Sequence, residues 1–483
     1  MAGENSSHDA GNLRQRWLAL MVLCLGVLMI VLDTTIVNVA LPSIRQDLNF
    51  SETSLVWVVN AYMLTFGGFL LLGGRLGDLF GHRRVFLGGI VLFTVASLAC
   101  GVAHSQELLI AARAVQGLGG AVVSAVALSL IMNLFTEPGE RAKAMGVYGF
   151  VCAGGGSIGV LLGGLLTSAF SWHWIFLVNL PIGVAVYALC LRLIAPGAGV
   201  AGQKLDVAGA ITVTLSLMLA VYGVVNGNEA GWRSAHTLGL LGTAAALMVA
   251  FVTIESRVAA PLMPLALFKL RNVSTANVVG VLWAAAMFAW FFISALYLQL
   301  VLGYSPMQVG LAFLPANLIM AAFSLGLSAK IVIRFGIRAP LAVGLGLAAV
   351  GLLLFAQAPL GGQFAVHVLP GMLLLGLGAG IAFNPLLLAA MSDVSPADSG
   401  LASGVVNTAF MMGGALGLAV LASLAAARTT ALVAAGTVPA AALNGGYQWA
   451  FAFGAFFAGL AAVLSACLIR TASPGGLQAV PAH

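Results

Sequence analysis

Residues 31–42, VLDTTIVNVALP, end a long apolar stretch that begins near Trp17. Within this stretch, Asp33 places a carboxylate among apolar neighbours, at a depth where water is scarce. Insertion scales put an Asp at the centre of a membrane span at about +2.5 to +3.5 kcal/mol. A cost of that size points to a carboxylate that the protein needs for its function.

The composition places the whole chain in a lipid bilayer. Of its 483 residues, 61% are hydrophobic and 7% are charged, whereas a soluble protein has about a quarter of its residues charged. The five cysteines lie in apolar stretches without metal-ligand spacing, so we expect neither a disulfide framework nor a metal site. We expect no cofactor. The net charge of +6 follows from the loops between the spans, and we expect no nucleic-acid partner.

Apolar windows long enough to cross a hydrocarbon core of about 30 Å predict an all-α membrane protein with fourteen transmembrane helices. The windows are 17–40, 53–72, 84–103, 108–132, 143–167, 174–194, 206–225, 237–255, 274–301, 307–329, 339–357, 364–391, 400–427 and 447–469. With the N-terminus in the cytoplasm, sixteen of the twenty Lys and Arg residues fall on the cytoplasmic side, as the positive-inside rule requires. Both termini are therefore expected in the cytoplasm.

The order of the spans predicts two six-helix bundles with a helix pair inserted between them. A Pro- and Gly-rich stretch, APGAGVAGQK (195–204), follows the first six helices. The predicted parts are a cytoplasmic tail at 1–16, a bundle at 17–200, two inserted helices with a cytoplasmic connector at 201–272, a second bundle at 273–470 and a cytoplasmic tail at 471–483.

A second buried charge, Arg113, lies inside the fourth predicted helix. An Arg in lipid is costly and usually pairs with an acid inside the bundle. Asp33 is the only acid well inside a predicted span, so the two are natural partners, either directly or through Gln116 or a water. The plain alternative is an Arg that extends to the membrane surface, or a purely structural pair.

The loop after the second predicted helix reads GGRLGDLFGHRR (73–84). Its glycines, among them Gly74 and Gly81, allow a tight turn. Asp78 can accept hydrogen bonds from Arg83 or Arg84, or cap a neighbouring helix. A weaker copy, SAKIVIRFGIR (328–338), stands at the matching place in the second half and indicates an internal repeat.

The fifth predicted helix contains GGGSIGVLLGG (154–164). Gly155, Gly159 and Gly163 recur every four residues and, with Gly164, favour close packing against another helix. The same letters spell the Gly-x-Ser-x-Gly of a serine-hydrolase nucleophile elbow, which is an alternative. That alternative lacks a base, because every His lies at a span end, in a loop or at a terminus. No Lys precedes Ser or Thr, so the chain has no P-loop for ATP.

Taken together, these stretches resemble the major facilitator superfamily and, within it, the fourteen-span drug:proton antiporters. LDTTIVNVALP (32–42) resembles the first-helix signature of that subfamily, RAVQGLGGA (113–121) its proton-coupling motif, and GGGSIGVLLGG its antiporter motif, although Val160 replaces the usual proline. Further similar stretches are GRLGDLFGHRR (74–84), WHWIFLVNLPIG (172–183), LDVAG (205–209), YLQLVLGYSPMQVGLAFLP (297–315) and GLASGVVNTAFMMGGALG (400–417).

The resemblance implies a transporter, not an enzyme, whose bundles open a central cavity alternately to each side of a bacterial cytoplasmic membrane. Its implied partners are an amphipathic small-molecule substrate, protons and the lipid bilayer. It would be a monomer that accessory export proteins could join. We expect Asp33 and Arg113 to couple proton movement to export, because coupling needs a group whose charge changes. Loop 73–84 would act as a conformational switch.

The candidate substrate contacts are polar or polarizable side chains at mid-span depth, where ordinary helix packing is the alternative for each one. They are Asn38, Asn60, Tyr62, Gln116, Tyr297, Gln299, Asn384, Asn407 and Met411. Two rival functions stay open: export of a single metabolite or self-made antibiotic, and a non-transporting membrane sensor. A sensor would not need the titrating core that Asp33, Arg113 and Asp78 suggest.

Overall fold

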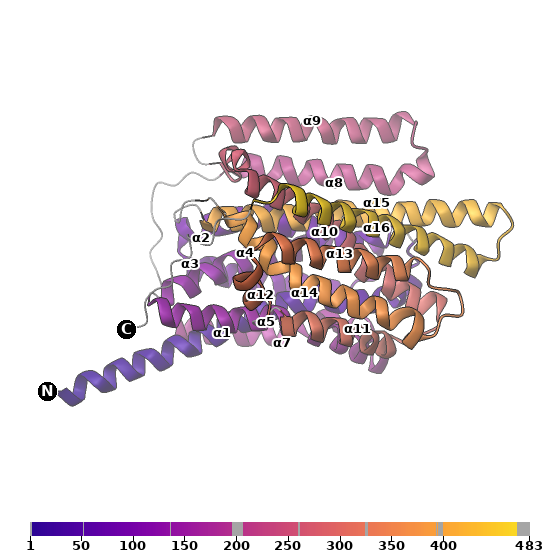
Figure 1. Cartoon of the computed structure of the whole chain (residues 1–483). Coiled ribbons are helices and arrows are strands. Elements are labelled where there is room, and N and C mark those ends of the chain that lie inside the picture. The colour runs from indigo at the N-terminus through magenta and orange to yellow at the C-terminus, as the bar shows by residue number, and fades with distance from the viewer. Residues whose placement is uncertain are drawn as a thin grey trace.

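A computed structural model describes residues 2–51, 53–135, 137–195, 206–258, 261–323, 327–392, 394 and 399–470 (Figure 1). In these residues every regular element is helical. The first half contains α1 (Ala2–Leu48), α2 (Val56–Phe80), α3 (His82–Gly101), α4 (Gln106–Leu134), α5 (Pro138–Ala169), α6 (Trp174–Leu177) and α7 (Asn179–Leu193). The inserted pair is α8 (Val207–Ala230) and α9 (Ala235–Arg257).

The second half contains the short helix η1 (Leu265–Lys269), then α10 (Arg271–Leu296), η2 (Tyr297–Val301), α11 (Pro306–Ala322), α12 (Ser328–Phe335), α13 (Arg338–Phe355), η4 (Phe364–Val368), α14 (Leu369–Met391), α15 (Ser399–Ala434) and α16 (Pro439–Leu468). Serine residues cap the N-terminal ends of three of the helices. Ser105, Ser234 and Ser305 each accept a hydrogen bond from a backbone N–H of the first turn, which would otherwise lack an intrahelical partner.

The prediction of an all-α membrane protein is confirmed for the described residues. Twelve of their helices are long and apolar enough to cross a membrane. The other two predicted spans, 143–167 and 307–329, fall on α5 and on α11 with α12. There the described apolar helices, Ile158–Ala169 and Pro306–Ala322, are shorter than the other twelve. The count of fourteen spans and the cytoplasmic termini therefore stay predictions.

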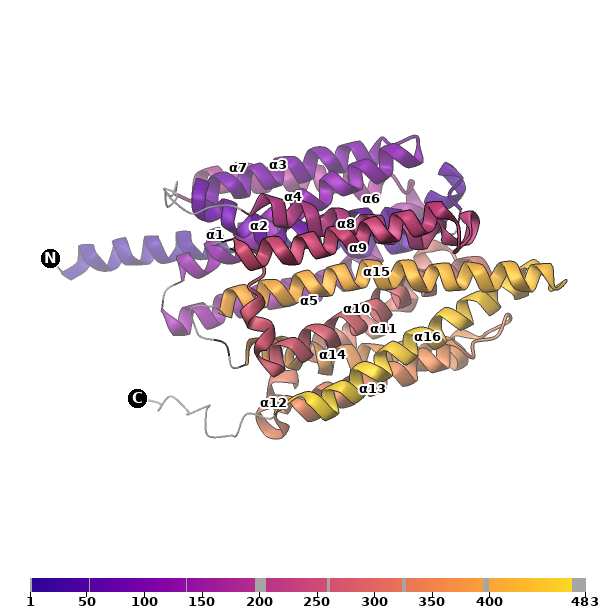
Figure 2. The same cartoon turned by 90° about the horizontal axis from the view of Figure 1, so that it is seen from above.

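The helices pack as two groups with the inserted pair beside them. In the first half, α1 packs against α5, and α4 packs against α2 and α3. In the second half, α15 packs against α10 and α13 packs against α14 and α16. Helices α8 and α9 pack on each other, and α8 contacts both α2 and α15. Figure 2 shows this pair lying over the junction of the two halves.

Helix α1 begins and α16 ends at the same end of the bundle (Figure 1), which we call the terminal end; the opposite end is the far end. Two turns at the terminal end support the internal repeat. Gly81 follows α2 with φ +88°, and Gly336 follows α12 with φ +73°. These are the left-handed conformations that glycine adopts at little cost. The two halves therefore each place a glycine with positive φ at the matching turn, although ψ is 125° at Gly81 and −171° at Gly336.

Replacing Gly336 by alanine tests the backbone conformation of this turn alone, because a Cβ there would meet no atom within 4 Å. We expect Gly336→Ala to destabilise the folded protein by about 1–3 kcal/mol, because φ +73° with ψ −171° is a conformation that residues with a Cβ rarely adopt. The measurement is the thermal unfolding midpoint in detergent. The control is Gly346→Ala in α13, where the added Cβ is equally free. That variant should unfold at the wild-type temperature or above it, because Ala favours helix. Equal losses in the two variants would contradict this explanation.

Candidate functional site

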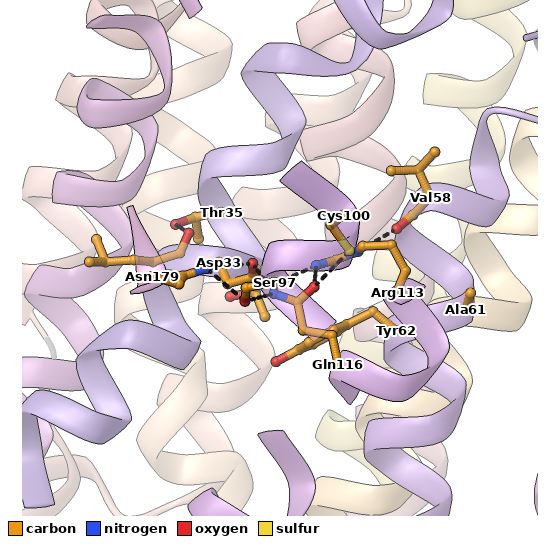
Figure 3. Close-up of polar contacts among 12 residues, drawn as sticks. Asp33, Thr35, Val58, Ala61, Tyr62, Ser97, Cys100, Arg113, Gln116 and Asn179 are labelled. Carbon is orange, nitrogen blue, oxygen red and sulfur yellow. Dashed lines mark hydrogen bonds and ion pairs between the residues drawn. The ribbon is translucent and has the colours of Figure 1, made fainter. Parts of the chain in front are cut away.

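Asp33 and Arg113 form an ion pair in the middle of the first half (Figure 3). Their side chains are 0% and 1% exposed, and Arg113 Nη1 lies 2.5 Å from Asp33 Oδ2. Gln116, one turn along α4 from Arg113, joins both partners. It accepts a hydrogen bond from Arg113 Nη1 at 2.6 Å and donates one to Asp33 Oδ1 at 2.7 Å. The predicted pairing is therefore direct and is also bridged by Gln116.

Three further helices complete this network. Arg113 Nε donates to the carbonyl oxygen of Val58 in α2 at 2.9 Å. Asn179, at the start of α7, donates to Asp33 Oδ1 at 3.2 Å. Gln116 donates to Ser97 Oγ in α3 at 2.7 Å. Five helices thus take part in one hydrogen-bond network around the buried charge pair, four of them through direct bonds and α3 through Gln116. Removing one partner from such a pair costs about 3–5 kcal/mol, because it leaves an uncompensated charge.

Aromatic rings cover the guanidinium of Arg113. Its Cζ lies 4.4 Å from the ring centroid of Tyr62 and 5.6 Å from that of Phe176, both within cation–π range. The Tyr62 hydroxyl has no hydrogen-bond partner among the described residues. Arg113 is therefore held by a carboxylate, an amide, a backbone carbonyl and two π faces.

Three members of this site were not predicted from the sequence: Ser97, Asn179 and Phe176. Asn179 and Phe176 lie in WHWIFLVNLPIG (172–183), and a lone Asn in an apolar stretch is a usable signal for a buried polar contact. Ser97 gives no such signal, because single serines are common in membrane helices.

The prediction of a loop at residues 73–84 is wrong: these residues form the last two turns of α2, a tight turn at Gly81 and the start of α3. The side chain of Asp78 lies outside the described residues, so its predicted hydrogen bonds stay untested. Arg83 Nη2 donates to the carbonyl oxygen of Leu191 at the end of α7, at 2.8 Å, and Arg84 is exposed. A Cβ at Gly74 would have one neighbour, Ala125 Cβ, 3.9 Å away in α4. The turn between α2 and α3 is therefore held to the end of α7 through Arg83 at the terminal end.

The glycines of α5 bring it against helices of both halves. A Cβ at Gly155 would lie 2.9 Å from the side chains of Leu28 and Val31 of α1, and one at Gly163 would lie 2.7 Å from the carbonyl oxygen of Ile36. Gly159 faces α1 in the same way. A Cβ at Gly164 would instead lie 2.8 Å from the carbonyl oxygen of Pro306 in α11. α5 is also one continuous helix, unlike the strand-to-helix turn of a nucleophile elbow.

Two of the predicted substrate contacts, Asn60 and Gln299, form hydrogen bonds between the two halves. Asn60 Nδ2 in α2 donates to the Ala415 carbonyl oxygen in α15 at 2.9 Å. Gln299 Nε2 in η2 donates to the Val39 carbonyl oxygen in α1 at 2.9 Å. At the far end, the backbone N–H of Met307 in α11 donates to Ser168 Oγ in α5 at 3.2 Å.

The remaining candidates lie apart from one another. Asn38 donates within its own helix, to the Thr34 carbonyl oxygen at 3.3 Å. Tyr297 donates to the Pro359 carbonyl oxygen at 3.0 Å, within the second half. Met411 lies close to Gly67 of α2. Asn384 is half-buried in α14, and Asn407 is in α15. The structure therefore gathers Gln116 and Tyr62 at the charge pair and Asn60, Gln299 and Met411 at the junction of the halves.

Two hollows open at the far end. One, of about 720 Å³, lies between the end of α1 and the second half. Its lining residues are Pro42, Ser43, Arg45, Gln46, Asn49, Phe50, Gln299, Leu300, Tyr304 and Pro306. The other, of about 500 Å³, lies beside His173, whose ring stacks on Trp172 at 3.7 Å. Partial burial lowers the pKa of His173, and the nearby Asp47 carboxylate opposes that shift. This imidazole is therefore mostly neutral at neutral pH.

A two-part helical membrane bundle with a fully buried acid–arginine pair is the architecture of a secondary transporter. The sequence profile of the Major Facilitator Superfamily matches residues 23–418, and the chain belongs to that family of integral, multi-pass transporters. The chain is also similar to a solved structure, that of the nucleoside transporter NupG. The TM-score is 0.65 and the identity 14%, and the match covers 94% of this chain and all of that one; at that identity the likeness concerns the fold alone.

Three relatives are similar over most of their length. The puromycin resistance protein pur8 of Streptomyces alboniger is 40% identical over 94% of this chain and 92% of its own. The cephamycin export protein CmcT of Amycolatopsis lactamdurans is 41% identical over 85% of each chain. The multidrug resistance protein Stp of Mycobacterium tuberculosis is 36% identical over 86% of this chain and 76% of its own. The names of these proteins refer to resistance or export. The resemblance to the superfamily is thus confirmed.

Adding one methyl group at Gly163 tests the contact between α5 and α1. We expect Gly163→Ala to destabilise the protein by about 1–3 kcal/mol, because the new Cβ would press on the Ile36 carbonyl oxygen and force the helices apart. The matched control is Gly156→Ala on the same helix, where the nearest atom is 3.9 Å away. The measurement is the thermal midpoint of both variants in detergent, and a control that loses as much as Gly163→Ala would refute the contact.

Proposed function

We propose that this protein exports antibiotics or similar amphipathic small molecules across the bacterial cytoplasmic membrane in exchange for protons. It would act by alternating access and as a transporter, not an enzyme. The observation that carries the proposal is the buried Asp33–Arg113 pair, which lies in a hydrogen-bond network that includes residues of five helices. The relatives named for puromycin resistance, cephamycin export and multidrug resistance support the substrate class.

In this proposal, Asp33 is the group that takes up and releases the transported proton. A proton on Oδ2 would remove the charge that attracts Arg113 Nη1, while Oδ1 would keep its bonds from Gln116 and Asn179. Arg113 would remain bound to the Val58 carbonyl and the Tyr62 ring. Protonation would therefore loosen α1 from α4 without leaving the guanidinium unsolvated. That local change would favour one orientation of the two halves over the other.

The proposed orientation places the terminal end in the cytoplasm, because the basic loops lie there, with fourteen spans in all. The far end then faces outward. Asn60 and Gln299 each cross between the halves near that end, so this arrangement would be closed to the outside. These two side chains would act as an outer latch. The other mid-span candidates, including Tyr62, Asn407 and Met411, would be the first places to seek substrate contacts.

A second candidate function is export of one particular antibiotic. Two of the three relatives carry the name of a single compound class, puromycin or cephamycin, and the third is named for multidrug resistance. A panel that contains puromycin, a cephamycin and unrelated amphipathic dyes separates narrow from broad export. Accumulation of several unrelated compounds would support the multidrug function, and accumulation of one compound would support a dedicated exporter.

The substitution Asp33→Asn tests proton coupling directly. In vesicles with an imposed proton gradient, wild-type protein should accumulate substrate against its gradient, and Asp33→Asn should accumulate none, because the amide cannot take up and release a proton. The control is Glu107→Gln, which also removes one carboxylate but from an exposed site at the start of α4; it should transport like wild type.

Loss of the carboxylate leaves Arg113 unpaired, so folding must be controlled separately. The double variant Asp33→Asn, Arg113→Gln removes both charges and should unfold at a higher temperature than Asp33→Asn alone, because no unpaired charge remains. It should still fail to transport uphill. Uphill transport at the wild-type rate by either variant would contradict the role proposed for Asp33.

A further inference from the structure

Two carboxyl groups at the terminal end of α8 and α9 take no part in the mechanism proposed above. Asp206 stands just before α8 and is 4% exposed, and Glu255 lies in the last turn of α9 and is 3% exposed. Each has one oxygen bound to a backbone N–H. Asp206 Oδ1 accepts from Gly209 at 2.7 Å, and Glu255 Oε2 accepts from Met263 at 2.9 Å.

The second oxygen of each carboxyl has no such partner. Asp206 Oδ2 and Glu255 Oε1 are buried and form no hydrogen bond within the described part of the chain. Both point at the same place, because a Cβ at Gly209 would collide with both of them. Because a Cβ at Gly209 would lie within 2.6 Å of both oxygens, the two oxygens are at most about 5 Å apart. The two unpaired oxygens therefore face one small space.

Among the described residues, no Lys or Arg side chain balances the two negative charges of these carboxyls through an ion pair. The side chains of α2 that pack here include the apolar Phe69, Leu72 and Leu76. The basic residues of α2 and α9 near this end are Arg75, which is half-buried, and Arg257, which is exposed.

The connector joins α9 to α10, and its described residues are 258 and 261–270. It presents two backbone N–H groups to Glu255, those of Leu262 and Met263. Two ionised carboxylates in contact would repel strongly in such a site.

One proton resolves this conflict, because it neutralises one carboxyl and gives it an O–H that donates to the other. A metal ion fits less well. Calcium takes about 6–8 oxygen ligands, whereas two oxygens are free here, and the described residues contain no group of three His, Cys, Asp or Glu side chains that could hold a metal. A proton therefore fits the space between the two carboxyls better than a metal ion does.

We propose that Asp206 and Glu255 form a second proton-binding site, separate from Asp33, in which the two carboxyls share one proton. The site would tie the connector to the inserted helices through the Met263 N–H. After loss of the proton, the two carboxylates would repel each other. That repulsion would break the hydrogen bond from the Met263 N–H to Glu255 and so free the connector. Its role would be to sense pH at the terminal end, which is the cytoplasmic side in the proposed orientation.

The connector is well placed to pass such a change to both halves. Leu262 belongs to a buried cluster with Leu72 of α2 and Ala210 of α8. Met263 packs on a cluster that contains Ala402 and Val405 of α15. Helices α2 and α15 come from different halves and pack on each other. A connector released from Glu255 would therefore loosen the junction of the halves at the terminal end.

Infrared spectra of the purified full-length protein in detergent at neutral pH test the shared proton. We expect a carbonyl band of a protonated carboxyl in wild type, and its loss in both Glu255→Gln and Asp206→Asn. Each amide can donate the hydrogen bond that the proton supplied, so both variants should fold. The band should persist in Glu107→Gln, the exposed control. A wild-type protein without the band, or variants that retain it, would overturn the proposal.

The pH dependence of stability and of connector protection gives a second readout. Folded wild type would hold a proton that the unfolded chain releases at neutral pH, so its stability should fall as pH rises. Over the same range, hydrogen exchange of the Leu262 and Met263 backbone amides should quicken in wild type and stay constant in Glu255→Gln, after correction for the intrinsic pH dependence of exchange. Equal corrected rates in the two proteins would contradict the proposed bond between the connector and Glu255.

Stabilisation of wild type by added NaCl, but not by matched KCl, would instead indicate a sodium site and overturn the proton site. None of these measurements needs a transported substrate, so they stand or fall independently of the proposed export.

Discussion

The ion pair of Asp33 and Arg113 fixes the centre of the first half. Neither charge reaches water, so each needs its partners from the protein, and those partners come from α1, α2, α4 and α7, with α3 bonded to Gln116 behind them. A charge pair that is satisfied from so many helices can stay buried only while those helices keep their positions. The same property lets one proton affect all of them, because neutralising Asp33 changes a contact on which the whole group depends.

The junction of the halves follows from smaller features arranged around this centre. Glycines bring α5 close to α1 on one face and to α11 on another, and the inserted helix α8 contacts α2 and α15. The far end is joined by hydrogen bonds between side chains and backbone, while the terminal end is packed through the connector. The two ends are thus held by different chemistry, which would allow one to open while the other stays shut.

Much of this arrangement could be predicted from the sequence, and the rest depends on three-dimensional pairing. Asp33, Arg113 and Gln116 were predictable because charges in apolar stretches must find partners inside the bundle. The contributions of Ser97 and of the Val58 carbonyl were not, because neither stands out in a sequence. Asp206 and Glu255 each look like an ordinary residue at a span end. They meet because α8 and α9 run antiparallel, so that the start of one helix lies beside the end of the other.

The hydrogen bonds at the far end have an asymmetry that bears on how this protein can change. Asn60 and Gln299 supply specific amide donors, but their acceptors are the backbone carbonyls of Ala415 and Val39. Every residue type carries that carbonyl. The side chains at 415 and 39 can therefore vary to suit a different cargo or lipid while the bond persists, whereas a single change at 60 or 299 removes it. Sequence change at this junction is therefore constrained at the two residues that donate the hydrogen bonds and free at the two residues whose carbonyls accept them.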